Sequence, residues 1–145
     1  MSVLFTRVRP KWFTPVAQLG TLWHLAACFL VIAQYRGVAT EYAPFAAAEQ
    51  QLLASQPGWL LVLRAVGLLL GTAGSLMLAT KKAAAIPLLT LTFLSHTGLL
   101  TQRLLATDAW SQFSHLGINQ PLLMALVSTY LLFLTYRAAT AGWLR

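Results

Sequence analysis

Long apolar stretches alternate with shorter polar ones along the chain, and the apolar stretches set its predicted architecture. An α-helix rises about 1.5 Å per residue, so about 20 apolar residues cross a hydrocarbon layer of roughly 30 Å. Segments of about this length that carry almost no charge occur four times: 13–35, 58–79, 83–105 and 119–136. We therefore predict an all-α integral membrane protein, a single domain over residues 1–145 that forms a four-helix antiparallel transmembrane bundle.

The polar connections between these segments differ in length. Thr80, Lys81 and Lys82 form a very tight turn, which makes the second and third spans antiparallel neighbours. The two predicted outer loops, 36–57 and 106–118, are longer. Within the first of them, residues 43–55 contain good helix formers in an amphipathic arrangement. Both a short helix on the membrane surface and an irregular loop agree with that segment.

The second predicted span carries its small residues on one stripe. They recur at helical spacing: Gly67, Gly71, Gly74 and Ser75. Small residues let the backbone of another helix approach closely, which is how helices pack in lipid. Arg64 falls on the same stripe, and an arginine inside a membrane is costly unless it faces protein, water or headgroups. The stripe is therefore predicted to face other helices, and the leucine-rich remainder to face lipid.

Composition and charge agree with this architecture and orient it. The chain is 58% hydrophobic and 9% charged, whereas about a quarter of the residues of a soluble protein are charged. Basic residues gather at one predicted end of the bundle, namely Arg7, Arg9, Lys11, Lys81, Lys82, Arg137 and Arg145, and the acids Glu41, Glu49 and Asp108 at the other. The positive-inside rule then predicts a multi-pass protein of the bacterial inner membrane with both termini cytoplasmic, N-in and C-in. Because the cations lie at the ends of apolar segments, we expect the lipid bilayer as a partner and no nucleic acid.

Two histidines lie at similar predicted depths in different spans, His24 in the first and His96 in the third. One interpretation is that they ligate a haem iron or another metal. The other is that each imidazole is neutral and forms a hydrogen bond with another helix, as polar groups in membrane bundles commonly do. The second interpretation is favoured, so no metal and no cofactor are expected, and haem is kept as an alternative.

Polar residues near the predicted outer ends of the spans form a second candidate site: Arg64, Arg103, Gln102 and Asp108. A guanidinium group suits carboxylate and phosphate, so one interpretation is a polar vestibule that binds an anionic group. The other is that the arginines reach outer headgroups or pair with acids for structural reasons. Arg64 is the strongest ligand-binding candidate because it lies deepest in its span.

The sequence offers little that points to catalysis. It contains no phosphate-binding loop, no HExxH and no nucleophile elbow, and no predicted span contains an acid. Cys28 is the only cysteine, so neither an intrachain disulfide nor a thiolate cluster is possible. We therefore expect no enzymatic activity and assign no catalytic residue.

The chain resembles a group of small four-span bacterial inner-membrane proteins that are often catalogued as sugar transporters although their function is not established. The resemblance covers nearly the whole chain and rests on these motifs: Trp12-Phe13-x-Pro15-Val16-Ala17, Leu22-Trp23, Gln56-Pro57-x-Trp59, the glycines Gly67, Gly71 and Gly74, Lys81-Lys82-Ala83 and Gly142-Trp143-Leu144. His24 departs from the pattern, because asparagine is usual after Leu-Trp in that group. The resemblance implies a four-span fold and supplies no catalytic residues.

These observations rank three functions. The first is a small non-enzymatic membrane protein, either an accessory or interaction subunit or a bundle that binds a lipid or small molecule, with self-association or a larger membrane complex expected. The second is a sugar-like small-solute transporter, which needs an oligomer because four short spans leave little room for an aqueous path. The third is a membrane haem or redox protein that uses His24 and His96.

Overall fold

The computed structural model describes residues 8–35, 57–106 and 119–145. This part of the chain forms the helices α1 (Phe13–Tyr35), α3 (Gly58–Ala79), α4 (Ala85–Ala106) and α6 (Asn119–Thr140). The first two have the predicted bounds, whereas α4 begins two residues later and α6 continues four residues further than predicted. The predicted outer loops, with the segment 43–55, lie outside the described residues except at their edges.

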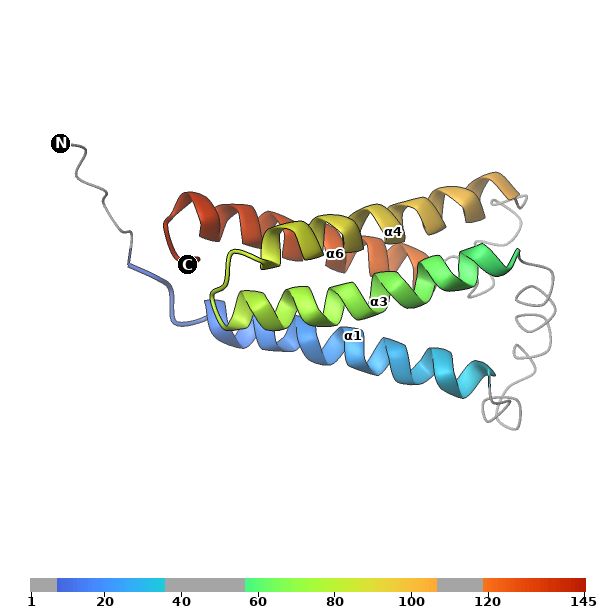
Figure 1. Cartoon of the computed structure of the whole chain (residues 1–145), viewed down its shortest axis with the longest axis horizontal. Helices are drawn as coiled ribbons and strands as arrows, with labels where there is room; N and C mark the ends of the chain where they lie inside the picture. The colour runs from blue at the N-terminus through green and yellow to red at the C-terminus, as the bar shows by residue number, and fades with distance from the viewer. Residues whose placement is uncertain (1–7, 36–56, 107–118) are drawn as a thin grey trace.

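The helices form a bundle in which each packs mainly against the next one in the sequence. α3 lies between α1 and α4, and α4 lies between α3 and α6, as Figure 1 shows. Contacts between α1 and α6 are few. We call the end that holds Phe13, Ala79, Ala85 and Thr140 the turn end, and the opposite end, with Gly58 and Asn119, the loop end.

The predicted membrane character is confirmed for three of the described helices. Phe13–Ala33, Gly58–Ala79 and Gln120–Thr140 are long and apolar enough to cross a membrane. α4 has a similar length, but its most apolar stretch is less apolar than those of the other three, because polar residues interrupt it along its course: Thr90, Thr92, Ser95, His96, Thr97, Thr101, Gln102 and Arg103. Several of these, including Thr92 and His96, are buried, so the polar groups of α4 partly face the inside of the bundle.

The turn end holds a closely packed apolar core to which all the described helices contribute. Its buried members are Phe13, Ala17, Leu78, Ala85, Leu89, Leu131, Leu134 and Ala138. The ring of Phe13 meets that of Trp143 edge to face, with centroids 5.4 Å apart. Trp143 follows α6, so this contact joins the start of α1 to the segment that leaves the last helix.

The same C-terminal motif ends α3 and α6. After α3, the Lys81 N–H donates to Leu78 O and the Lys82 N–H donates to Met77 O, while Lys81 has a φ of 63°. After α6, Gly142 has a φ of 72° and the Trp143 N–H donates to Ala138 O. This is the Schellman arrangement, which usually places glycine at the left-handed position because a side chain there is strained. Lysine occupies that position in the first turn.

Packing is looser at the loop end. There the buried apolar cluster has fewer members, namely Ala27, Val31, Leu68 and Met124. Figure 1 shows α1 and α4 farther apart at this end than at the turn end. The larger apolar core therefore lies at the turn end, and the cavity of the candidate site lies toward the loop end.

Candidate functional site

The site is built on the small-residue stripe of α3. Gly67, Gly71, Gly74 and Ser75 are all buried. A Cβ added to Gly74 would lie 2.8 Å from Leu89 Cγ, and one added to Gly67 would lie 2.9 Å from Ser95 Cβ. Both neighbours belong to α4, so the stripe lets the α4 side chains reach the α3 backbone.

The stripe also receives the two histidines. The His24 ring of α1 packs against Gly71, so that a Cβ at Gly71 would overlap it. The His96 ring of α4 packs against Gly67, whose added Cβ would lie 3.3 Å from His96 Nε2. The two imidazoles are stacked with centroids 5.9 Å apart and planes 12° apart, and both are almost fully buried. The structure thus brings together two residues that the sequence placed only at a similar depth.

Hydrogen bonds fix the proton position on each ring. His24 Nδ1 lies 2.8 Å from Gly20 O, and because a carbonyl only accepts, Nδ1 carries the proton. The Ser128 hydroxyl donates to Met124 O at 2.8 Å. It therefore accepts from His96 Nδ1–H at 2.6 Å. Both Nε2 atoms are left with a lone pair, and both are buried without a hydrogen-bond partner among the residues that the structure describes.

The close contact between His24 and Gly71 determines whether the two histidines have room to bind a haem. A haem iron bonded to His24 Nε2 would need room for a porphyrin, whereas Gly71 lies so close to that ring that one added carbon overlaps it. As packed here, the pair does not fit a haem. Among residues 8–35, 57–106 and 119–145, no group of three or more His, Cys, Asp or Glu side chains is placed to hold a metal ion.

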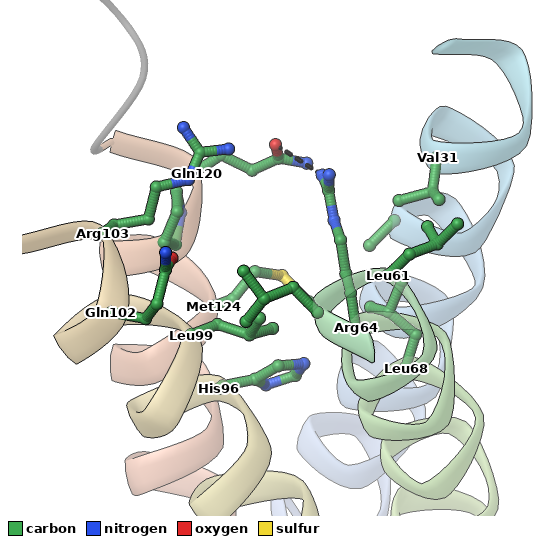
Figure 2. A pocket seen from close by; sticks show the side chains of 13 residues that line it. Val31, Leu61, Arg64, Leu68, His96, Leu99, Gln102, Arg103, Gln120 and Met124 are labelled. Carbon is green, nitrogen blue, oxygen red and sulfur yellow. Dashed lines mark hydrogen bonds between the residues drawn. The ribbon is translucent and has the colours of Figure 1, made fainter. Parts of the chain in front are cut away.

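A cavity of about 40 Å³ lies on the loop-end side of His96. Figure 2 shows the ring of His96 below it and the side chains of Arg64, Gln120 and Arg103 above it. All the described helices line it: Ala27, Val31, Leu60, Leu61, Arg64, Leu68, His96, Leu99, Gln102, Arg103, Gln120, Pro121 and Met124. By volume it holds roughly three water molecules, or a group of the size of a carboxylate.

Polar groups are concentrated at the mouth of the cavity. Arg64 Nη2 of α3 donates to Gln120 Oε1 of α6 at 2.8 Å, and this bond spans the mouth in Figure 2. Arg64 and Arg103 each make further interactions. Among the residues that the structure describes, the cavity lining includes two arginines and no acid. A guanidinium group has five N–H donors, so Arg64 can serve several acceptors at once.

The structure places the predicted site residues as follows. Arg64, Arg103 and Gln102 line one cavity, as the vestibule hypothesis requires, while Asp108 lies outside the described residues. Gln120, which accepts from Arg64, was not predicted as its partner. Its signal in the sequence is weak, because a polar residue directly before Pro121 is typical of any helix start.

No family model, curated protein or solved structure matches this chain. The resemblance to the four-span inner-membrane group therefore stays a prediction, and the function is argued from the site.

Proposed function

We propose that this protein is a non-enzymatic four-span bundle of the bacterial inner membrane that binds a small anionic group in the cavity at its loop end. The single observation that carries the proposal is the composition of that cavity. Two arginines and two glutamines lie at its polar end, and its walls are apolar. An anionic group that enters such a site exchanges water for charge-assisted hydrogen bonds, which are stronger than hydrogen bonds between neutral groups.

The proposal treats α4 as the fourth span. α4 packs along α3 and α6, both of which are apolar enough to cross a membrane. Its buried polar residues face helices rather than lipid, which makes them tolerable at membrane depth. The described basic residues at the turn end are Arg9, Lys11, Lys81, Lys82, Arg137 and Arg145, so the positive-inside rule supports a cytoplasmic turn end with both termini there.

Binding is favoured over transport by the filled half of the bundle. Below the cavity lie the stacked rings of His24 and His96, and beyond them lies the apolar core of the turn end. The cavity lining does not extend past His96 into that core. Transport of a sugar-like solute therefore requires a pathway between several copies, which is the alternative function.

The test compares anion binding by matched arginine variants. The protein is purified in a gentle detergent, and native mass spectrometry records retained molecules and the binding of two added probes, phosphatidylglycerol and sn-glycerol 3-phosphate. We expect Arg64→Leu to weaken binding of whichever probe the unsubstituted protein binds by about tenfold or more, because a hydrogen bond to a charged group contributes about 1.5–3 kcal/mol. Arg137→Leu removes an exposed arginine at the turn end and serves as the control, with an expected change below about twofold.

The same experiment can reject the proposal. If neither probe nor any retained anionic molecule depends on Arg64, the arginine is structural and the cavity is not an anion site. Thermal unfolding of both variants in detergent separates lost binding from lost folding. We expect Arg64→Leu to fold, because its bond to Gln120 is only partly buried and its loss leaves a neutral amide rather than an unpaired charge.

A further inference from the structure

The packing around the bundle is uneven, and among helices that lie side by side the weakest contact is between α1 and α6. The α1–α3, α3–α4 and α4–α6 pairs pack extensively, whereas α1 and α6 approach each other at few positions. One close approach is at Gly20, where an added Cβ would lie 2.8 Å from Leu131 Cδ2. Another is the Trp23 indole N–H, which donates to Met124 Sδ at 3.2 Å. We call the boundary between α1 and α6 on the loop-end side of this bond the α1–α6 seam.

The α1–α6 seam forms one wall of the cavity. Ala27 and Val31 of α1 line the cavity on one side of the seam, and Gln120, Pro121 and Met124 of α6 line it on the other. The seam is closed by thin or adaptable side chains, because alanine has a single side-chain carbon and methionine changes shape easily. No such weak boundary separates the other neighbouring helices, which pack extensively where they are described.

The outer side of the seam is apolar. Exposed residues close in sequence to the wall residues include Leu30 of α1 and Leu123 of α6. In a membrane these side chains face the hydrocarbon of the bilayer. A hydrocarbon chain that crosses the seam therefore passes from apolar cavity walls to lipid without meeting water.

The size of the cavity limits what it can enclose. About 40 Å³ accommodates a carboxylate or part of a phosphate headgroup, and neither a sugar ring nor an acyl chain fits beside it. A ligand with an anionic headgroup at the arginines and an apolar remainder must therefore leave most of its volume outside the cavity. The α1–α6 seam is the boundary through which that remainder can pass with the least disturbance of helix packing.

We propose that the anionic group belongs to an amphiphile from the bilayer, which places its headgroup at Arg64 and Arg103 and its hydrocarbon chain through the α1–α6 seam. This inference rests on the proposed anion-binding function and names the class of ligand. An amphiphile and a soluble ligand would both present an anionic group to the arginines. The two sources differ in whether a hydrocarbon chain contributes to binding and in which helices that chain touches.

The experiment uses the full-length protein in detergent with four probes. These are phosphatidylglycerol, phosphatidylcholine with the same acyl chains, soluble sn-glycerol 3-phosphate, and phosphatidylglycerol that carries a photoactivatable diazirine in one acyl chain. Two tryptophan variants are compared: Ala27→Trp, which fills the seam from inside, and Ile32→Trp, which introduces the same side chain at an exposed position of α1 away from the seam. Because Ala27→Trp is a buried substitution that can disturb folding, Ala27→Leu is measured beside it.

We expect phosphatidylglycerol to bind with an affinity at least tenfold above that of phosphatidylcholine. We also expect a hundredfold excess of sn-glycerol 3-phosphate to leave its binding unchanged. Ala27→Leu should weaken the binding of phosphatidylglycerol and Ala27→Trp should weaken it further, whereas Ile32→Trp should bind it as the unsubstituted protein does. Photolysis should attach the acyl chain to residues 27–31 of α1 and 120–124 of α6, and Arg64→Leu should remove this labelling.

Two results would overturn the inference while leaving the proposed function intact. One is effective competition by sn-glycerol 3-phosphate, which would identify a soluble anion as the ligand. The other is Arg64-dependent binding of phosphatidylglycerol whose acyl chain labels α3 or α4 instead of α1 and α6. Binding that is indifferent to Arg64 would reject the proposed function and the inference together.

Discussion

Gly71 of α3 lies directly against the imidazole of His24 of α1, with no room for a side chain between them. Only glycine is small enough to let the His24 side chain approach the α3 backbone this closely. In this position the His24 ring stacks on that of His96. The first prediction follows from this contact.

Gly71→Ala should destabilise the bundle, because its new methyl group overlaps the His24 ring and forces α1 away from α3. Overpacking of this kind costs about 1–3 kcal/mol. Thermal unfolding in detergent, followed by circular dichroism, measures the change. Gly98→Ala is the matched control: it lies in a helix interior with nothing within 4 Å of the added Cβ, so it should be neutral or stabilise by up to about 1 kcal/mol. Equal effects of the two substitutions would contradict the described packing.

Ser128→Ala should leave the Nδ1–H of His96 buried without its acceptor. An unsatisfied buried donor costs about 1–3 kcal/mol. Thr129→Ala removes the hydroxyl of an exposed residue, which donates to Ala125 O within α6, and should cost less. The two variants are compared by thermal unfolding, and a smaller loss for Ser128→Ala than for Thr129→Ala would argue against the assigned proton positions.

Lys81→Gly should stabilise the protein. Lys81 has a φ of 63°, where a side chain is strained by about 1–2 kcal/mol. The greater freedom of glycine in the unfolded chain offsets part of the gain, so we expect a net increase of about 0.5–1 kcal/mol. Lys82→Gly has no such strain to relieve, since Lys81 is the one non-glycine residue with a positive φ among those described. A higher unfolding temperature for Lys82→Gly than for Lys81→Gly would refute this account of the turn.

Membrane topology is tested by single cysteines placed at exposed positions in a Cys28→Ser background. Gly58→Cys and Leu105→Cys should react with an impermeant thiol reagent added from the periplasm, and Lys82→Cys only from the cytoplasm. The comparison of Lys82→Cys with Leu105→Cys tests whether α4 crosses the membrane, because these positions lie near its two ends. Labelling of both from the same side would mean that α4 is not the fourth span.

The sequence predicted the helices more successfully than their mutual contacts. Long apolar segments identify each helix regardless of its neighbours, so α1 and α3 have the predicted bounds. Polar residues interrupt α4, and its most apolar stretch is less apolar than those of the other three helices. Hydropathy alone does not show that several of these polar residues face other helices.

The candidate site was predictable only in part. The spacing within α3 placed Arg64 on the same stripe as Gly67, and both are near the site in the structure. Which side chain meets Arg64 depends on how the helices rotate about their axes and how their ends align. Neither quantity is encoded in the spacing within one helix, so the bond to Gln120, 56 residues away, could not be predicted. The contact between His24 and His96 has the same origin, because a similar depth does not specify which way each ring points.

The neighbour-to-neighbour packing of the helices has a consequence for biosynthesis. Because each helix packs mainly on the one made just before it, the growing chain can add helices one at a time as they enter the membrane. Among the described helices, the contacts that α6 makes with α1 and α3 join more distant parts of the sequence and are few. Since α6 also supplies Gln120 and Met124 to the cavity wall, a nascent chain that has made α1, α3 and α4 already holds Arg64, but it acquires a closed binding site only when α6 arrives.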